Sequence, residues 1–197
     1  MIGIIDYGAG NLRSIINACI FLGYKTQIIT KPEELEGVDK IILPGVGNFG
    51  SAMKKIERFQ NSINSRIQDG VPFLGICLGI QVMFDESDES PDISGLSIFK
   101  GKCIRFPDNV KVPHMGWNSI YIRKKSPIIK GIPDNSMFYF AHSYYPVPEN
   151  EDIIIATTEY ELSFPSIVGY GNVFATQFHP EKSGKIGLKL LKNFLEI

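Results

Sequence analysis

The sequence VPFLGICLGIQVMF at residues 71–84 changes its pattern halfway along. Residues 71–76 form a short apolar run typical of a buried strand, whereas residues 78–84 are typical of a helix. Cys77 therefore lies where a strand is expected to become a helix. Short β-branched runs also alternate with longer amphipathic stretches on the N-terminal side, and this alternation predicts a parallel sheet with helices packed against it.

The second half of the chain differs, because its shorter apolar runs are separated by Pro, Gly and Asn. Such runs predict antiparallel strands added to the parallel core, with Gly171 and Asn172 as a hairpin turn. The expected strands are residues 2–6, 27–30, 40–43, 72–77, 103–106, 115–122, 137–141, 153–158, 167–170 and 173–178. The expected helical stretches are residues 11–22, 49–68, 78–84 and 186–195. The polar residues 85–92 are expected to form a solvated loop. We predict an α/β fold whose mixed, mostly parallel central sheet is flanked by helices.

Composition indicates one globular domain spanning residues 1–197. With 44% apolar and 21% charged residues, the chain is large enough to bury a full core. A formal charge of -1 argues against nucleic acid or an anionic membrane as ligand, since phosphates require clustered Lys and Arg. No apolar run reaches the length of a membrane span, so a cytosolic protein is expected. Three scattered cysteines predict neither disulfides nor a structural metal.

Cys77 has the surroundings of a nucleophile held in a sharp turn. Gly75 and Gly79 lack the β-carbons that would collide with neighbouring backbone in a strand-to-helix elbow. A helix N-terminus at this position favours a thiolate and provides the Leu78 N–H for an oxyanion. The alternative for this motif alone is a small buried residue at the end of a central strand, which is common for cysteine.

Three histidines are available as a base for Cys77, namely His114, His142 and His179. His179 follows an expected strand and precedes Pro180, and a residue before proline favours extended geometry. Residues two apart in an extended chain face the same side, so His179 and Glu181 should point together. The acid would then fix the imidazole tautomer while the other nitrogen takes the thiol proton. The alternative is a chance pair of a strand-end histidine and a surface glutamate.

Two glycine-containing loops follow expected strands. PGVGNFG at residues 44–50 can present backbone N–H groups, so that Val46 or Gly47 would complete an oxyanion hole with the amide after the nucleophile. The alternative is a permissive turn between strand and helix. DYGAGNLR at residues 6–13 begins like a dinucleotide-binding fingerprint, but Arg13 replaces its third glycine. No nicotinamide or other cofactor is therefore expected.

The chain resembles class I, triad-type glutamine amidotransferases over essentially its full length. GICLGIQ alone would fit many of them. Four further segments make the likeness strongest to the glutaminase subunits of imidazole glycerol phosphate synthases: DYGAGNLRS (6–14), PGVGNFG (44–50), PHMGWN (113–118) and QFHPEKSG (177–184). Two small departures are Ile80, where methionine is usual, and Ala141, where a larger apolar residue is frequent.

The resemblance implies a flavodoxin-like amidotransferase fold and hydrolysis of glutamine to glutamate and ammonia. Ammonia would pass to a separate cyclase subunit folded as a (β/α)8 barrel, which forms imidazole glycerol phosphate and an aminoimidazole carboxamide ribotide in histidine biosynthesis. It also implies weak activity without that partner, because the oxyanion loop would rest in an unproductive orientation. The glycines at positions 45 and 47 would ease the required peptide flip.

The resemblance also implies roles for individual residues. The catalytic residues would be Cys77, His179 and Glu181. The glutamine-binding residues would be Gly47, Gln81, Glu89, Ser143 and Tyr144. The residues that contact the cyclase would be Asn11, Trp117, Tyr139 and Lys182. For Trp117 and Tyr139 the alternative is aromatic packing on a sheet or in the core.

Other functions remain open from the sequence alone. A stand-alone cysteine hydrolase or peptidase would share the cysteine and histidine but would need no partner and no glutamine. Another ammonia acceptor would be served by the same chemistry. A non-catalytic binding module would be expected to have lost part of the triad, and a redox protein would need a second thiol close to Cys77.

Overall fold

The computed structural model describes all residues from Met1 to Ile197. Its centre is an eight-stranded sheet with the order β2-β1-β3-β4-β13-β12-β11-β8. In that order the strands are Thr26–Ile29, Ile2–Ile5, Lys40–Gly45, Phe73–Cys77, Val173–Thr176, Ser163–Tyr170, Ile154–Glu159 and Tyr121–Ile122. The first five are parallel, and β12, β11 and β8 continue the sheet by antiparallel pairing. The predicted mixed, mostly parallel sheet is confirmed.

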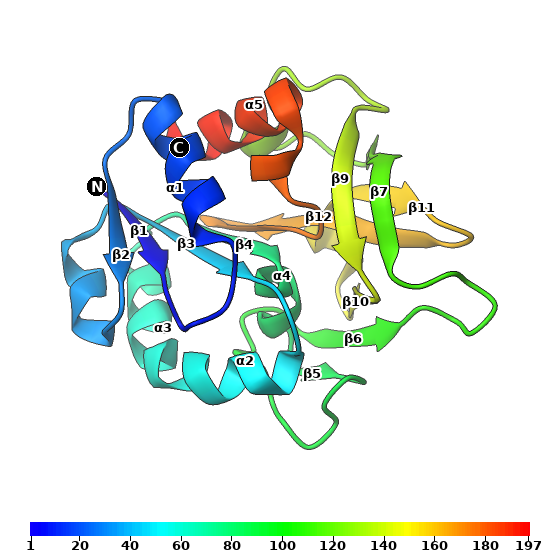
Figure 1. Cartoon of the computed structure of the whole chain (residues 1–197), viewed down its shortest axis with the longest axis horizontal. Helices are drawn as coiled ribbons and strands as arrows, with labels where there is room; N and C mark the ends of the chain where they lie inside the picture. Colours follow the sequence, from blue (N-terminus) through cyan, green and yellow to red (C-terminus); the bar gives the residue numbers. More distant parts are fainter.

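Helices cover both faces of this sheet (Figure 1). On one face lie α1 (Leu12–Phe21) and α5 (Gly184–Leu195); on the other lie α2 (Phe49–Ile56), α3 (Gln60–Gln68) and α4 (Leu78–Val82). Short 3-10 helices η1 to η5 occupy Pro32–Gly37, Glu57–Phe59, Pro127–Ile129, Glu151–Ile153 and Pro180–Lys182. None of the helices combines the length and apolar composition needed to cross a membrane.

Two small sheets lie beside the carboxyl ends of the parallel strands (Figure 1). One has the order β10-β6-β5, and the other pairs β7 with β9. Their strands are β5 (Glu86–Ser87), β6 (Gly101–Arg105), β7 (His114–Ser119), β9 (Met137–His142) and β10 (Tyr144–Pro148). Of these, β6, β7 and β9 correspond to strands that were expected to extend the central sheet, and they instead form a separate wall next to Cys77.

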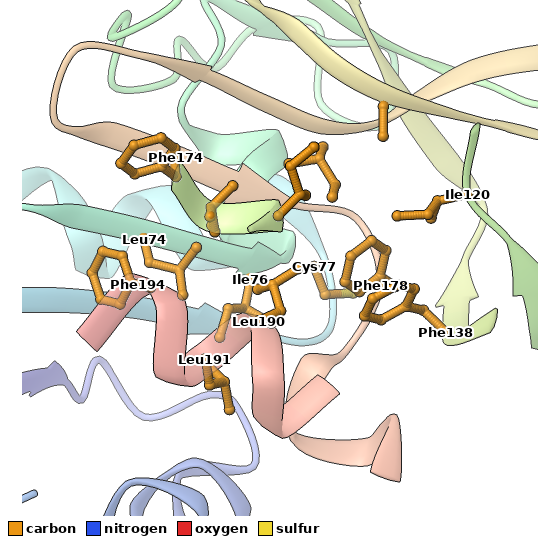
Figure 2. Packing of buried hydrophobic residues seen from close by; sticks show 14 of the residues in the cluster. Leu74, Ile76, Cys77, Ile120, Phe138, Phe174, Phe178, Leu190, Leu191 and Phe194 are labelled. Carbon is orange, nitrogen blue, oxygen red and sulfur yellow. The ribbon is translucent and has the colours of Figure 1, made fainter. Parts of the chain in front are cut away.

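A buried core lies between the central sheet and α5. Figure 2 shows Leu74 and Ile76 of β4 facing the α5 side chains Leu190, Leu191 and Phe194. All five are at most 1% exposed, and full burial of such a side chain contributes about 1.5–3 kcal/mol. The end of β4, and with it Cys77, is therefore held rigidly from this face.

Some predicted elements differ from the structure for identifiable reasons. Residues 49–68 were expected as one stretch, but a 3-10 turn at Glu57–Phe59 separates α2 from α3 and lets Phe59 reach the core. The helix after Cys77 ends at Val82 rather than at residue 84. Residues 173–178 were expected as an antiparallel strand, but β13 lies between β12 and β4 and is also parallel to β4. The hairpin predicted at Gly171 is present.

Two further differences concern the wall next to Cys77. Strand β10 was not predicted, and its Pro146 and Pro148 are unusual in a strand because proline has no N–H to donate. They are tolerated because β10 lies at the edge of its sheet. Residues 85–92 were expected to be a solvated loop, but they contain β5, and the Glu89 carboxylate accepts a hydrogen bond from the Phe49 N–H at 2.6 Å. This contact ties the segment to the start of α2.

Candidate active site

Cys77 lies at the junction of β4 and α4 in a conformation that non-glycine residues rarely adopt. Its φ is 55° and its ψ is -107°, as expected for a nucleophile elbow. Glycine is required on both sides of Cys77, because a Cβ at either position would be too close to neighbouring atoms. A Cβ on Gly79 would lie 2.1 Å from the Leu43 carbonyl oxygen, and one on Gly75 would lie 2.5 Å from Met83 Sδ. The predicted steric reason for the GxCxG motif is confirmed.

The parallel sheet brings the other site segments to Cys77. In the register of β3 and β4, Gly45 is the direct neighbour of Cys77, and β13 ends beside the same point. Because parallel strands share one carboxyl edge, the loops that follow β3, β4 and β13 meet there. The predicted loop at residues 44–50 and His179 therefore lie beside the cysteine.

His179 and Glu181 make the contact that the sequence predicted. His179 Nδ1 lies 2.9 Å from Glu181 Oε1, and the two side chains are 4% and 1% exposed. His179 has the expected extended backbone, with φ -97° and ψ 96°. Glu181, however, lies in the 3-10 helix Pro180–Lys182. The two side chains meet because the chain turns, so the explanation by extended-chain alternation was wrong.

The environment of His179 raises its pKa. Burial by itself lowers the pKa, but hydrogen bonds with Cys77 and Glu181, together with the negative charges of these partners, outweigh burial and raise it to about 10. The carboxylate fixes Nδ1–H, so Nε2 faces the sulfur. An imidazole in this position can accept a proton from a thiol and later donate it to a leaving amine.

A cavity of about 330 Å³ opens onto Cys77 and His179. All five residues that the resemblance assigns to glutamine line it: Gly47, Gln81, Glu89, Ser143 and Tyr144. Two of them are tied together, since Gln81 Nε2 donates to the Tyr144 carbonyl at 3.1 Å. The lining combines a carboxylate, amide groups and backbone, which suits a small ligand carrying both an ammonium and a carboxylate.

The loop after β3 lies over the same cavity. Val46, Gly47 and Leu78 line it, and Gly47 has a φ of 103°, a conformation that favours glycine. Gly45 is buried beneath the loop, where a Cβ would lie 2.5 Å from the Tyr7 hydroxyl. The three residues proposed as oxyanion donors thus line the same cavity as Cys77.

Comparisons with known proteins agree with this geometry. The family model "Glutamine amidotransferase class-I" matches residues 3–197. The chain belongs to this family. Solved structures that resemble it include "PurLQS from Thermotoga maritima" (TM-score 0.80, 17% identity, 99% of this chain and 97% of that one) and the glutaminase domain of Trypanosoma brucei CTPS (TM-score 0.66, 17% identity, 99% and 93%). At these identities they support the fold.

Curated relatives of this amidotransferase are similar over their whole length. "Imidazole glycerol phosphate synthase subunit HisH" of Methanocaldococcus jannaschii is 57% identical over 197 residues, which is 100% of both chains. The protein of the same name from Methanothermobacter thermautotrophicus is 50% identical over 100% of this chain and 98% of its own. Both relatives are named as subunits of a larger enzyme.

Three of the four residues expected to contact a partner lie together on the surface of the amidotransferase. Trp117 is 54% exposed, its ring meets that of Tyr139 at 6.2 Å, and Lys182 Nζ lies 6.0 Å from the Tyr139 ring. Trp117 is therefore not a core residue, while Tyr139 is half-buried and takes part in aromatic packing. Asn11 is exposed and caps α1 by accepting from the Ser14 N–H.

His114 and His142 were predicted only as alternative bases for Cys77, yet His142 also lines the amidotransferase cavity. Met115 and Pro113 line it too and were not predicted. The available signal was the alternation in PHMGWN, where every second residue shares one side of a strand. His114 and His142 are both buried and lie next to each other beside the site.

Proposed function

We propose that this chain is the glutaminase subunit of an imidazole glycerol phosphate synthase, and that residues 1–197 form one amidotransferase domain. It hydrolyses glutamine and delivers ammonia, in the cytoplasm, to a cyclase subunit with a (β/α)8 barrel. The partner then forms imidazole glycerol phosphate and aminoimidazole carboxamide ribotide. The observation that carries the proposal is that the strained Cys77 and His179 line one cavity, with His179 paired to Glu181.

The proposed reaction begins when His179 takes the proton of the Cys77 thiol and the sulfur attacks the side-chain amide carbon of glutamine. The resulting oxyanion accepts hydrogen bonds from the Leu78 N–H and from the N–H of Val46 or Gly47, and one such donor is typically worth about 3–4 kcal/mol. His179 donates a proton to the departing nitrogen, so ammonia leaves and a thioester remains. His179 then takes a proton from water, which attacks the thioester and releases glutamate. Glu181 orients His179 and stabilises its charged form.

The surface beside the cavity supports a docked partner over a stand-alone hydrolase. Met115 is 63% exposed and lines the cavity, and Trp117 and Met137 lie exposed on the same ribbon of β7 and β9. Exposed apolar side chains gathered at the mouth of a site are typical of an interaction surface. Ammonia released under such a contact would be shielded from protonation by bulk water.

The test separates glutamine hydrolysis from use of ammonia. A Cys77→Ala variant, combined with the cyclase, should lose glutamine-dependent turnover and keep turnover with added ammonium salt. Cys19→Ala is the matched control, because its thiol is also buried but lies in α1 and does not line the cavity. An equal loss of both reactions in Cys77→Ala would contradict the assigned role.

A second measurement addresses control by the partner. An electrophilic glutamine analogue should label Cys77 slowly in the isolated chain and faster when the cyclase and its ligand are present. Equal labelling rates in the two samples would rule out partner-dependent gating while leaving the hydrolytic role intact.

A further inference from the structure

His114 and His142 face each other across the two strands of the β7–β9 ribbon. They are direct cross-strand partners, and their side chains are buried. His114 Nδ1 lies 3.0 Å from His142 Nε2, and His142 Nδ1 lies 2.8 Å from the Tyr144 carbonyl oxygen. At the other end of the row, His114 Nε2 lies 3.2 Å from the amide nitrogen of Asn118.

Each hydrogen bond in this row has one direction when both rings are neutral. A carbonyl oxygen only accepts, so His142 Nδ1 carries the proton and His142 Nε2 accepts from His114 Nδ1–H. His114 Nε2 then accepts from the Asn118 amide group, whose oxygen is occupied by the Ser119 N–H at 2.8 Å. A second proton on either ring would place two donors face to face.

The surroundings of the row favour its neutral form. The His114 ring stacks between Tyr160 at 4.0 Å and Phe140 at 4.8 Å, and the His142 ring lies against Phe106 and Phe164. Burial lowers the pKa of His114 to about 4 and that of His142 to about 3. In such an apolar environment, a fully paired row of hydrogen bonds strongly favours one arrangement.

The row ends on the part of the cavity wall that faces the nucleophile. The Tyr144 carbonyl accepts from both His142 and Gln81, and the Ala141 carbonyl lies 3.7 Å from Cys77 Sγ. Ser143 and Tyr144 line the cavity between these two fixed points. A shift of His142 would therefore move the wall that the ligand must contact.

We propose that His142, and His114 through it, are positioning residues that hold the cavity wall at residues 141–144 in the shape that binds glutamine. The proposal rests on the glutaminase function proposed above. Neither ring exchanges a proton with substrate, because both nitrogens of each ring are already paired.

The first test is spectroscopic and does not depend on activity. Imidazole nitrogen NMR of the whole protein should show His114 and His142 as neutral Nδ1–H tautomers at neutral pH. In a His114→Phe variant, the His142 Nε2 resonance should shift because its donor is lost. Observation of an Nε2–H tautomer or of a charged ring at either position would overturn the proposed row.

The second test is kinetic and uses the complex with the cyclase and its ligand. His114→Phe keeps the stacking on Tyr160 and Phe140 but loses both hydrogen bonds, and it should raise the KM for glutamine about tenfold with kcat changed less than about threefold. His142→Leu should raise KM further. His142→Asn should recover most of this loss, because its amide can donate to the Tyr144 carbonyl in place of Nδ1.

Phe164→Leu is the packing control, since it loosens the same aromatic cluster without removing a hydrogen bond. An unchanged KM in His114→Phe, or an equal rise in Phe164→Leu, would overturn the positioning role. A wild-type complex that does not hydrolyse glutamine would instead overturn the proposed function. The two failures are therefore distinguishable.

Discussion

Replacing Cys77 by glycine and, separately, by alanine isolates the backbone strain at the proposed nucleophile. Both variants lose the sulfur and its chemistry, so they differ only in the Cβ. At a φ of 55° and a ψ of -107°, that Cβ crowds the neighbouring backbone. Glycine has no such contact, so it should be the more stable replacement at this position.

The magnitude follows from two opposing effects. A non-glycine residue in a sparsely populated backbone region costs about 1–3 kcal/mol. Glycine loses about 0.5–1 kcal/mol relative to alanine, because its unfolded chain has more freedom. The free energy of unfolding of Cys77→Gly should therefore exceed that of Cys77→Ala by about 1 kcal/mol. For a chain of this size, that corresponds to a difference in Tm of about 2–4 °C.

Denaturant unfolding of both variants measures the difference, and Cys19 provides the matched control. Cys19 is also buried, but it lies inside α1 and has no positive φ. There alanine should be more stable than glycine by about 1 kcal/mol, as in other helices. The expected result is a reversal of sign between the two positions. The same order of stability at both would refute the argument that Cys77 is strained.

Two other predictions concern the same elbow and its base. Gly79→Ala should lower the free energy of unfolding by about 1–3 kcal/mol because its Cβ meets the Leu43 carbonyl. Gly37→Ala is the control, since a Cβ there has no atom within 4 Å and the residue has no positive φ. It should change the free energy of unfolding by less than about 0.5 kcal/mol in the same denaturation assay. The pKa of His179 is raised from 6.5 to about 10, so the stability contributed by its protonated form is present below pH 6.5 and is lost as the pH rises towards 10. Unfolding measured across this range should show that loss in the wild type and a smaller one in Glu181→Gln; equal slopes would contradict a contribution from Glu181.

The local features of the site were predictable because they depend on neighbours in the chain. The strand-to-helix elbow at Cys77 requires glycine on both sides, and the GxCxG pattern shows this directly. The His179–Glu181 contact was predicted, although the 3-10 turn that produces it was not. His179 and Glu181 are only two residues apart, so few backbone geometries are available to them. The contact was therefore predicted correctly although the backbone conformation was not.

The wall opposite Cys77 was much less predictable. Strand β10 carries two prolines and is possible only at the edge of its sheet, a position that the other strands determine. The place of β13 between β4 and β12 depends on pairing with residues about 100 positions away, such as Phe73 with Val173. Pairing at such a distance is set by the packing of the whole core.

The sequence by itself determined which residue would be strained, which acid would meet which histidine, and that the strands of the N-terminal half would form a parallel sheet. Only the tertiary structure decided that His114 and His142 are joined in a row of hydrogen bonds ending at Tyr144. The reason is physical: steric limits and turns act between residues close in the chain, whereas the direction of a buried hydrogen bond depends on which distant groups packing brings together.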